Sequence, residues 1–534
     1  MVACRSSSTE SVKIPGYELV EMLHESGPRV IYRALRHDDG EQVILKTLLA
    51  EYPHEQDLAE IHREFKIVKR LSIEGVIHVH SLQSYGEGNL AIEMEDFGVP
   101  LADYMGQQRE QSIDLERFFS IAVGLAKILG QLHENDIIHK DVVPTNILID
   151  SDSGELRLID FGISSELSRE RQSITLSKCL EGTLPYISPE QTGRMNRDVD
   201  YRSDYYLLGV TLFELITGEL PFTARNTLEW VHRHITQPPP LAHAVNGRVP
   251  EQVSRIILKL MSKNAEDRYQ SSFGLVTDLE RCRDEIERNG TIVSFELGTA
   301  DVSRRFQISQ QLYGRDTELE QIEALFEDVS NGGAGLCLVS GYSGVGKSAL
   351  VNEFGKSVVS KQGYLIQSKF DKFHQSRAYS AIADAFQGLV QQLLNEPEEC
   401  LEDWRKSLHE ALGTNAQLLI NLVPELELII GEQPPVPDLP PTESQNRFQI
   451  LVLNFVKVFA SRQHPLAIFI DDLQWSDIPT LNLIQRLVTA RDLNYFFFVG
   501  AYRSNAVDER HPLRVTLNQI QKSHELAEVM LEPL

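Results

Sequence analysis

The amino-acid sequence predicts a multidomain protein in which an α+β domain is followed by an α/β domain with a parallel sheet. The chain has 534 residues, which is too long for a single hydrophobic core. Residues 17–49 alternate apolar and polar side chains as strands do, and helical patterns then continue to about residue 287. Beyond residue 312, apolar strands and helices alternate, which is typical of a parallel sheet with helical crossovers.

The charge of the chain argues against several classes of partner. The sequence has 77 Asp and Glu against 51 Lys and Arg, a net charge of -26. Proteins that bind anionic lipid, or nucleic acid of any sequence, rely on clustered Lys and Arg. The longest apolar runs, at 466–470 and 495–502, are too short to cross a bilayer. We therefore expect no nucleic acid partner and no membrane span.

Cysteine usage and the first residues indicate a cytoplasmic protein. Residues 1–13 lack the apolar core of a signal peptide. The five cysteines lie far apart and form no CxxC pair, so neither a zinc site nor a disulfide framework is predicted. They are Cys4, Cys179, Cys282, Cys337 and Cys400.

The first domain is expected to span residues 17–287, after a polar, disordered N-terminus at 1–16. Three strands are predicted within 17–49, because a turn at 37–40 interrupts the alternation. Helices are predicted at 58–71 and 115–133, where apolar residues recur at helical spacing. A small sheet therefore precedes a helical lobe.

The second domain is expected to span residues 312–534, after a linker at 288–311 that has no periodicity. Strands are predicted at 335–341, 466–470 and 495–501. The proline cluster at 432–441 is expected on the surface.

An apolar stretch of the first domain contains polar residues at fixed spacing. Residues 137–149 read IIHKDVVPTNILI and contain Asp141 and Asn146. Burying such groups unpaired costs a few kcal/mol each, which points to a functional role. Asp160-Phe161-Gly162 follows 19 positions after Asp141, while Lys46 lies in an upstream strand and Glu64 in the next helix.

This ordered set resembles the signature motifs of protein kinases. The resemblance extends from about Tyr17 to Glu285 and includes Ser188-Pro189-Glu190, Asp204 and Arg268. It implies a bilobal protein-kinase fold with ATP and Mg²⁺ as ligands. It also implies that Lys46 holds the phosphates and pairs with Glu64, that Asp160 and Asn146 bind magnesium, and that Asp141 orients the substrate hydroxyl.

Gly182-Thr183 resembles the serine/threonine class of these enzymes, in which Thr183 would hydrogen-bond to Asp141. Protein serine or threonine hydroxyls are therefore the expected substrates. Simpler interpretations remain for single residues: Glu64 as an exposed helix residue and Thr183 as an ordinary turn residue.

The first domain departs from the family pattern at several positions. His24, Ser26 and Arg29 stand where the three glycines of the phosphate-covering loop would align, so the backbone would approach phosphates less closely. Val143 replaces a common lysine, which predicts reduced turnover. Lys140 replaces an arginine that would bind a phosphorylated activation segment, here Thr175 or Ser177, with a bidentate fork.

A second constellation follows the linker. GYSGVGKS, at 341–348, fits the phosphate-binding pattern G-x-x-x-x-G-K-[ST] between a strand and a helix. Loop amides and the helix N-terminus suit phosphate, so this P-loop predicts nucleotide contacts from Lys347 to the outer phosphates and from Ser348 to magnesium. The glycines concerned are Gly341, Gly344 and Gly346.

Acidic residues follow the strand at 466–470. Asp471 is expected to bind the metal and Asp472 to polarise a hydrolytic water, although both could instead cap the strand end. Arg503, at the end of another strand, could sense the terminal phosphate or be a surface residue.

From Leu312 onward the sequence resembles STAND-type, AAA-related P-loop ATPases, on LYGRDTELEQIEALF, the P-loop, IDDLQWSD and GAYR. Such modules usually continue further, so VMLEPL is expected to be a truncation point. The order of the two modules resembles large bacterial, chiefly cyanobacterial, sensor kinases, which implies downstream signalling domains as partners.

Three hypotheses for function follow from these patterns. The first is an ATP-dependent serine/threonine protein kinase coupled to a regulatory ATPase in signal transduction. The second is a pseudokinase scaffold in which only the P-loop domain binds and hydrolyses ATP, favoured by the altered loop and Val143. The third, a DNA-linked regulator, ranks last because the sequence has no basic patch.

Overall fold

The computed structural model describes two compact units. Unit 1 comprises the described residues of Met1–Gln172, Asp200–Pro221 and Pro240–Phe306, and unit 2 those of Ser173–Val199, Phe222–Pro239 and Gln307–Leu534. The described residues are 13–533 without 27, 51–52, 72, 87, 108–113, 167–181, 194–198, 303–313, 371–377, 395–397, 438, 523 and 525.

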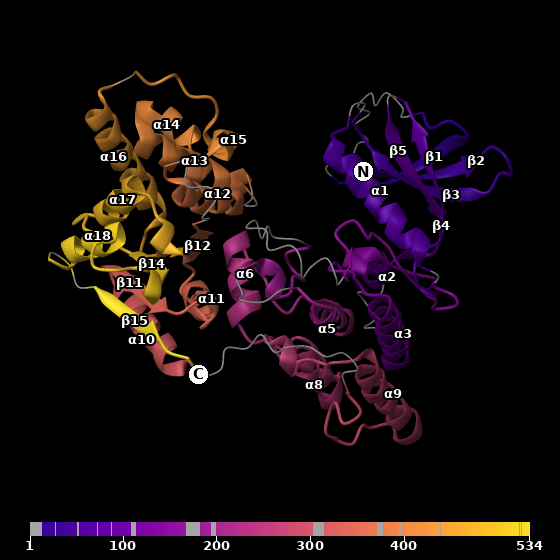
Figure 1. Cartoon of the computed structure of the whole chain (residues 1–534). Coiled ribbons are helices and arrows are strands. Elements are labelled where there is room, and N and C mark those ends of the chain that lie inside the picture. The colour runs from indigo at the N-terminus through magenta and orange to yellow at the C-terminus, as the bar shows by residue number, and fades with distance from the viewer. Residues whose placement is uncertain are drawn as a thin grey trace. The chain divides into compact units, whose positions relative to one another are not determined.

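Unit 1 begins with an antiparallel sheet of five strands in the order β1-β2-β3-β5-β4 (Figure 1). Its core includes Val43, Leu45 and Ala91, which are completely buried. Helix α1 packs on β4 and β5. The bounds are β1 Tyr17–Ser26, β2 Arg29–Arg36, β3 Gln42–Leu48, α1 Glu55–Arg70, β4 Val79–Tyr85 and β5 Asn89–Glu95.

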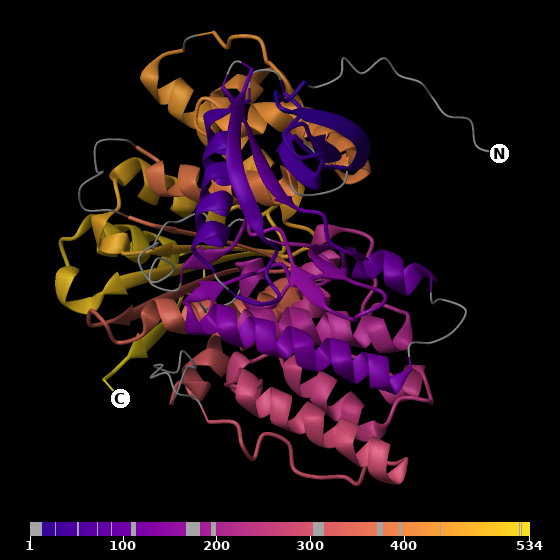
Figure 2. The same ribbon diagram turned by 90° about the vertical axis from the view of Figure 1, so that its right-hand side faces the viewer.

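The rest of unit 1 is mainly helical, with α3 packed against α9 (Figure 2). Helix α3 starts where Asp114 caps it by accepting a hydrogen bond from the amide of Arg117 at 2.7 Å. The helices are α2 Leu101–Gln107, α3 Leu115–Glu134, α5 Arg202–Thr217, α7 Ala242–Val245, α8 Glu251–Leu260 and α9 Ser272–Asn289.

Short strands in unit 1 support the loop that carries Asp141 and Asn146. Strands β6, β8 and β9 form one small sheet, and β7 pairs with β10. Ile147 and Ile149 of β8 are fully buried, so the aliphatic flanks of this loop anchor it in the core. The strands are β6 Val99–Pro100, β7 Ile137–Ile138, β8 Ile147–Ile149, β9 Leu156–Leu158 and β10 Ser165–Glu166.

Unit 2 is built on a parallel sheet of five strands in the order β12-β13-β14-β11-β15. The three inner strands, β13, β14 and β11, are buried on both faces over most of their length, which explains their nearly continuous apolar sequences. In β11, Leu336 and Leu338 pack on one face, while Cys337 and Val339 pack on the other. The strands are β11 Ala334–Gly341, β12 Tyr364–Lys369, β13 Leu466–Asp471, β14 Phe496–Arg503 and β15 Ala527–Leu531.

Helices cover both faces of this sheet. One apolar cluster includes residues of α10 and α11, and the other includes residues of α12, α16 and α17. Helix α6, also in unit 2, packs on α11. The bounds are α6 Thr227–Thr236, α10 Asp316–Ser330, α11 Lys347–Ser360, α12 Ser380–Leu394, α13 Glu398–Leu412, α14 Ala416–Ile420, α15 Glu427–Ile430, α16 Pro441–Phe459, α17 Ile478–Val488 and α18 Pro512–Gln521.

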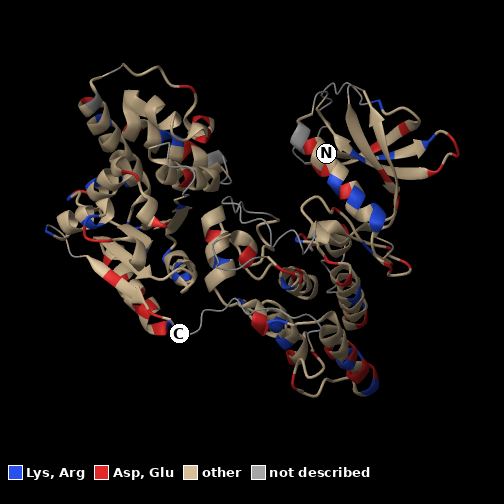
Figure 3. Ribbon diagram, viewed as in Figure 1, with Lys and Arg blue, Asp and Glu red and all other residues tan. Residues whose placement is uncertain are grey.

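Acidic and basic residues are interspersed along the ribbon of each unit (Figure 3). Within the described part of the chain, no helix is both long and apolar enough to span a membrane.

Two candidate active sites

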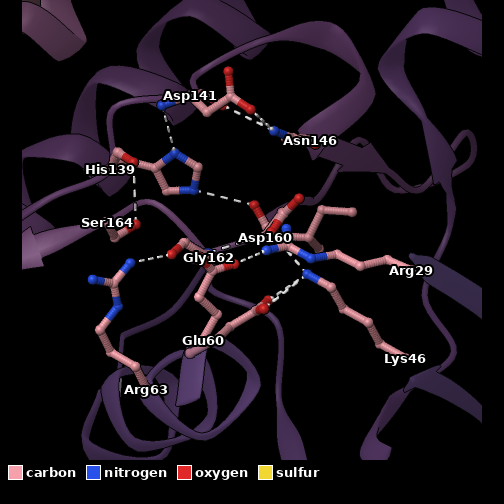
Figure 4. Close-up of polar contacts among 12 residues, drawn as sticks. Arg29, Lys46, Glu60, Arg63, His139, Asp141, Asn146, Asp160, Gly162 and Ser164 are labelled. Carbon is pink, nitrogen blue, oxygen red and sulfur yellow. Dashed lines mark hydrogen bonds and ion pairs between the residues drawn. The ribbon is translucent and has the colours of Figure 1, made fainter. Parts of the chain in front are cut away.

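The first site is centred on Lys46, which lies in β3 and contacts two carboxylates. Its Nζ lies 2.7 Å from Oε1 of Glu64, on α1, and 2.7 Å from Oδ1 of Asp160. Lys46 and Glu64 are only 4% and 5% exposed, which rules out the exposed-helix interpretation of Glu64. A buried charge without a partner costs several kcal/mol, so each of these groups depends on the others. Figure 4 shows Lys46 directed at Asp160.

The surroundings of Asp160 keep its carboxylate ionised. Burial alone would raise the pKa of Asp160, but the positive charge and hydrogen bond of Lys46, the charge of Arg29 and the amide of Gly162 lower this pKa to about 2. Burial likewise opposes the charge on Lys46, and the carboxylates of Glu64 and Asp160 outweigh it and raise the Lys46 pKa. The site therefore holds a fixed ion-pair network at neutral pH.

The turn before Asp141 is held in a strained conformation by Asp204. Lys140 has a left-handed backbone with φ of 70°, which is unfavourable for a residue with a long side chain. The carboxylate of Asp204, in α5, accepts hydrogen bonds from the amides of His139 and Lys140 at 3.0 and 2.8 Å. Asp204 is completely buried, and His133 Nε2 lies 2.8 Å from it. This contact explains the conformation of the turn.

Asp141 and Asn146 form a second contact in the same unit. The Asn146 side-chain amide donates to Oδ2 of Asp141 at 2.7 Å and to its backbone carbonyl at 3.2 Å. The backbone amide of Ile159 donates to the backbone carbonyl of Asn146 at 2.9 Å. His139 Nε2 donates to the backbone carbonyl of Ile159 at 3.1 Å. These bonds tie the loop to the residue that precedes Asp160 (Figure 4).

Two arginines that no motif predicts as ligands lie beside the Asp160-Phe161-Gly162 segment. Arg29 forms an ion pair with Glu60 of α1, and Arg63 of the same helix donates to the carbonyl of Gly162. A Cβ added to Gly162 would lie 3.2 Å from both Arg29 Nη1 and Asp160 Oδ1. The sequence signal for these contacts was weak, because charged residues are common on the exposed surfaces of both strands and helices.

The remaining motif residues of the first constellation lie in different places. Arg268 is 1% exposed and donates to backbone carbonyls, including that of Arg202 at 2.9 Å. Ser188 donates to Gln191 at 2.8 Å within unit 2. Thr183 also belongs to unit 2, so its predicted bond to Asp141 stays a prediction. Thr175 and Ser177 lie outside the described residues.

The second site is the turn between β11 and α11 in unit 2. Gly344 and Gly346 have φ of 79° and 102°, where L-residues are strained, so glycine is needed there. A Cβ on Gly341 would lie 2.7 Å from the Leu531 carbonyl oxygen. Lys347 Nζ donates to the carbonyls of Gly341 and Tyr342 at 3.1 and 2.8 Å, so its side chain folds back over the loop.

The two aspartates after β13 have different partners. Ser348 Oγ donates to Oδ2 of Asp471 at 2.7 Å, so the two predicted magnesium ligands are in direct contact. Asp472 adopts a left-handed backbone with φ of 55° and forms ion pairs with Arg503 at 3.2 Å and Lys369 at 3.1 Å. A residue that only caps the end of a strand would not need these contacts of Asp471 with Ser348 and of Asp472 with two cationic side chains.

Lys369 and Gln474 were missed by sequence reasoning. Gln474 donates to Oδ1 of Asp472 at 2.6 Å and accepts the amide of Arg503 at 3.0 Å. Burial would raise the Asp472 pKa, but hydrogen bonds from Gln474 and Lys369 and the charges of Lys369 and Arg503 lower it. Lys369 ends a strand that pairs with β13, so only the strand order brings it here.

Both sites contain groups suited to a magnesium nucleotide. Magnesium prefers oxygen ligands, which Asp160 and Asn146 provide in unit 1 and Ser348 and Asp471 provide in unit 2. Each site also has a lysine beside these oxygens, either Lys46 or Lys347. The donor sets therefore fit the predicted ligands, while the roles of single residues remain predictions.

Comparison with known families gives two matches. Residues 23–276 match the protein kinase domain, and residues 311–499 match the AAA ATPase domain. The two matches follow one another along the chain in the predicted order.

Several individual proteins similar to this chain are kinases by name. Hybrid signal transduction histidine kinase G of Dictyostelium discoideum is 33% identical over 70% of this chain and 13% of that protein. The DNA damage-responsive serine/threonine-protein kinase RqkA of Deinococcus radiodurans is 33% identical over 48% of this chain and 38% of that protein. Serine/threonine-protein kinase PknB of Mycobacterium tuberculosis is 31% identical over 50% and 42%. The chain thus spans less than two thirds of each of these relatives.

Proposed function

The chain carries a protein kinase domain followed by an AAA ATPase domain, and from this we propose that it is an ATP-dependent serine/threonine protein kinase coupled to a regulatory P-loop ATPase. The observation that carries the proposal is the contact of Lys46 with both Glu64 and Asp160. Phosphoryl transfer requires a fixed cation for the phosphates next to a metal-binding carboxylate. The similarity to serine/threonine-protein kinases supports the choice of substrate class.

In the proposed reaction Asp141 accepts the proton of a serine or threonine hydroxyl as its oxygen attacks the γ-phosphorus. The bond between the γ-phosphorus and the bridging oxygen breaks, and ADP leaves. Magnesium, held by Asp160 and Asn146, would neutralise charge on the phosphates. Lys46 orients the phosphates, and the hydrogen bond from Asn146 keeps the carboxylate of Asp141 in position.

The pseudokinase alternative is less well supported. The altered glycine-rich loop and Val143 favour it, but a scaffold does not need a buried lysine between two carboxylates. Maintaining such a network has a desolvation cost. The similarity to serine/threonine kinases also favours the enzyme.

The kinase proposal can be tested by transfer of label from [γ-³²P]ATP to a generic protein substrate. We expect Asp141→Asn to lower the initial rate at least ~100-fold, because positioned proton acceptors contribute roughly that much. Asp152→Asn is the matched control, since Asp152 is an exposed carboxylate in the turn beyond the same loop.

Full transfer by Asp141→Asn would contradict the assignment of Asp141. Absence of transfer in the unmodified protein, under conditions where it binds Mg·ATP, would favour the scaffold. Phosphate release without a protein substrate, measured in parallel, reports on the ATPase module.

We propose that the P-loop module binds Mg·ATP through Lys347, Ser348 and Asp471 and hydrolyses it. Asp472 would polarise the attacking water, and Arg503 would sense the terminal phosphate. The proposed domain limits are 17–287 and 312–534, joined by the linker 288–311. A cytoplasmic location, protein substrates and downstream signalling domains complete the proposal.

A further inference from the structure

Arg29 occupies a position where the glycine-rich loop of a kinase would offer backbone amides to phosphate. It is the first residue of β2 and pairs in register with Ser26 of β1. The preceding residue, Pro28, has no amide hydrogen and so cannot donate. This hairpin therefore offers fewer backbone donors than a loop of glycines.

The side chain of Arg29 supplies hydrogen-bond donors beside the site, in place of these backbone amides. Arg29 Nη1 would lie 3.2 Å from a Cβ built on Gly162, the same distance as Asp160 Oδ1. The Arg29 side chain is 28% exposed, so solvent reaches it. Figure 4 shows the side chain extending toward Asp160 and Gly162. A guanidinium has five N–H donors in a planar fork that matches two phosphate oxygens.

Glu60 already binds this guanidinium. The carboxylate lies on α1, one turn before Glu64, and is 45% exposed. A half-exposed ion pair contributes little to stability and exchanges readily. A nucleotide phosphate carries more charge and more acceptor oxygens than one carboxylate, so it can displace Glu60.

We propose that Arg29 is a phosphate-binding residue of the kinase site, compensating for the lost loop glycines, and that Glu60 competes with the nucleotide for it. The inference rests on the proposed function, because it assumes that unit 1 binds ATP. Arg29 then acts on binding of the phosphates, whereas Lys46 and Asp160 supply the buried part of the site. Removing Arg29 and removing the charge of Glu60 should change affinity in opposite directions.

Isothermal titration of the full chain with Mg·ADP tests this, in a Lys347→Ala background that weakens the P-loop site. We expect Arg29→Ala to raise the dissociation constant about tenfold or more, from the loss of a charge-assisted hydrogen bond. Glu60→Gln should lower it several-fold, and Arg29→Lys should fall between Arg29→Ala and the parent. Binding of adenosine, which lacks phosphates, should be unchanged in all variants.

Arg33→Ala is the matched control. Arg33 lies on the same strand, is also 28% exposed and pairs with Glu21 and Asp96. Arg29→Ala and Glu60→Gln break the same ion pair, so a purely structural role would shift both affinities in the same direction. Thermal unfolding of each variant shows whether the fold is retained.

The outcomes separate this inference from the proposed function. Equal affinity in Arg29→Ala and Arg33→Ala, or weaker binding in Glu60→Gln, overturns the role of Arg29 while leaving the kinase proposal intact. If unit 1 of the Lys347→Ala parent binds no Mg·ADP, the proposed function itself fails. Opposite shifts for the two variants support the inference.

Discussion

Single residues at the first site depend on their partners for their charge. Lys46 is 4% exposed, and its charge persists only because two carboxylates lie at 2.7 Å. Asp160 in turn relies on Lys46, since burial alone would raise its pKa. The charges of Lys46 and Asp160 therefore depend on each other.

Lys46→Met tests this dependence through stability. It leaves two carboxylates without their cation, and we expect a loss of about 3 kcal/mol in the free energy of unfolding of unit 1 at pH 7. Because the Asp160 pKa lies below its usual value, the ionised carboxylate stabilises the fold above about pH 4, and this contribution fades as pH falls towards 2. The difference in the free energy of unfolding between Lys46→Met and the unmodified chain should therefore become smaller as the pH falls.

Urea unfolding between pH 2 and 7, interpreted through linear extrapolation, measures this difference across the range in which Asp160 titrates. Lys66→Met, on the same helix as Glu64 but outside the network, is the control. A deficit that stays constant or widens in acid would contradict the ion-pair interpretation.

At the scale of elements, tertiary contacts order segments that have no periodicity of their own. Residues 288–311 are predicted as a linker, yet Asp301 accepts hydrogen bonds from the Gln270 amide at 2.7 Å and from Ser271 Oγ at 2.6 Å. Ser271 in turn caps α9 by accepting from the Gly274 amide at 3.1 Å. The segment around Asp301 thus supports the start of α9.

Replacing a glycine inside a helix with alanine usually stabilises a protein, but Gly274→Ala should destabilise unit 1. Glycine inside a helix normally costs about 1 kcal/mol relative to alanine. Here a Cβ would lie 2.5 Å from Asp301 Cβ and 2.7 Å from its Cα, so Asp301 must move, and we expect a net loss of about 1–3 kcal/mol.

Gly388→Ala provides the opposite case. Gly388 lies inside α12 with no atom within 4 Å of the added Cβ, so the change should stabilise unit 2 by about 0.5–1 kcal/mol. Thermal unfolding distinguishes the two signs. Stabilisation by Gly274→Ala would show that Asp301 does not pack on α9.

At the scale of the whole molecule, each candidate site lies within one compact unit. Lys46, Asp141 and Asp160 belong to unit 1, and Lys347 and Asp471 belong to unit 2. A ligand that binds only the folded state stabilises the unit that binds it. The two sites should therefore respond separately to nucleotide.

Calorimetric unfolding with saturating Mg·ADP should show stabilisation of both units in the unmodified chain. At about 100 times the dissociation constant the gain is about 2.7 kcal/mol. Lys347→Ala should remove the gain of unit 2, and Asp160→Asn that of unit 1. Lys356→Ala, which removes a lysine of α11 that pairs with Glu353, should remove neither. Loss of both gains in one site variant would show that the units are not separate in nucleotide binding.

Much of the fold class could be predicted from the sequence because local patterns carry it. The helix predicted at 115–133 is α3, Leu115–Glu134, and the strand predicted at 466–470 is β13, Leu466–Asp471. Alternation and helical spacing are local signals that burial enforces. The P-loop was predictable for the same reason, since strand, turn and helix are contiguous.

By itself, the sequence determined the two types of domain, their order and the motif residues of each site, because these depend on spacing along the chain. Only the tertiary structure decided that Arg29 meets Glu60 beside Asp160 and that Lys369 pairs with Asp472. Such contacts join residues that are far apart in sequence. Their energies depend on burial and on strand order, which no local pattern encodes.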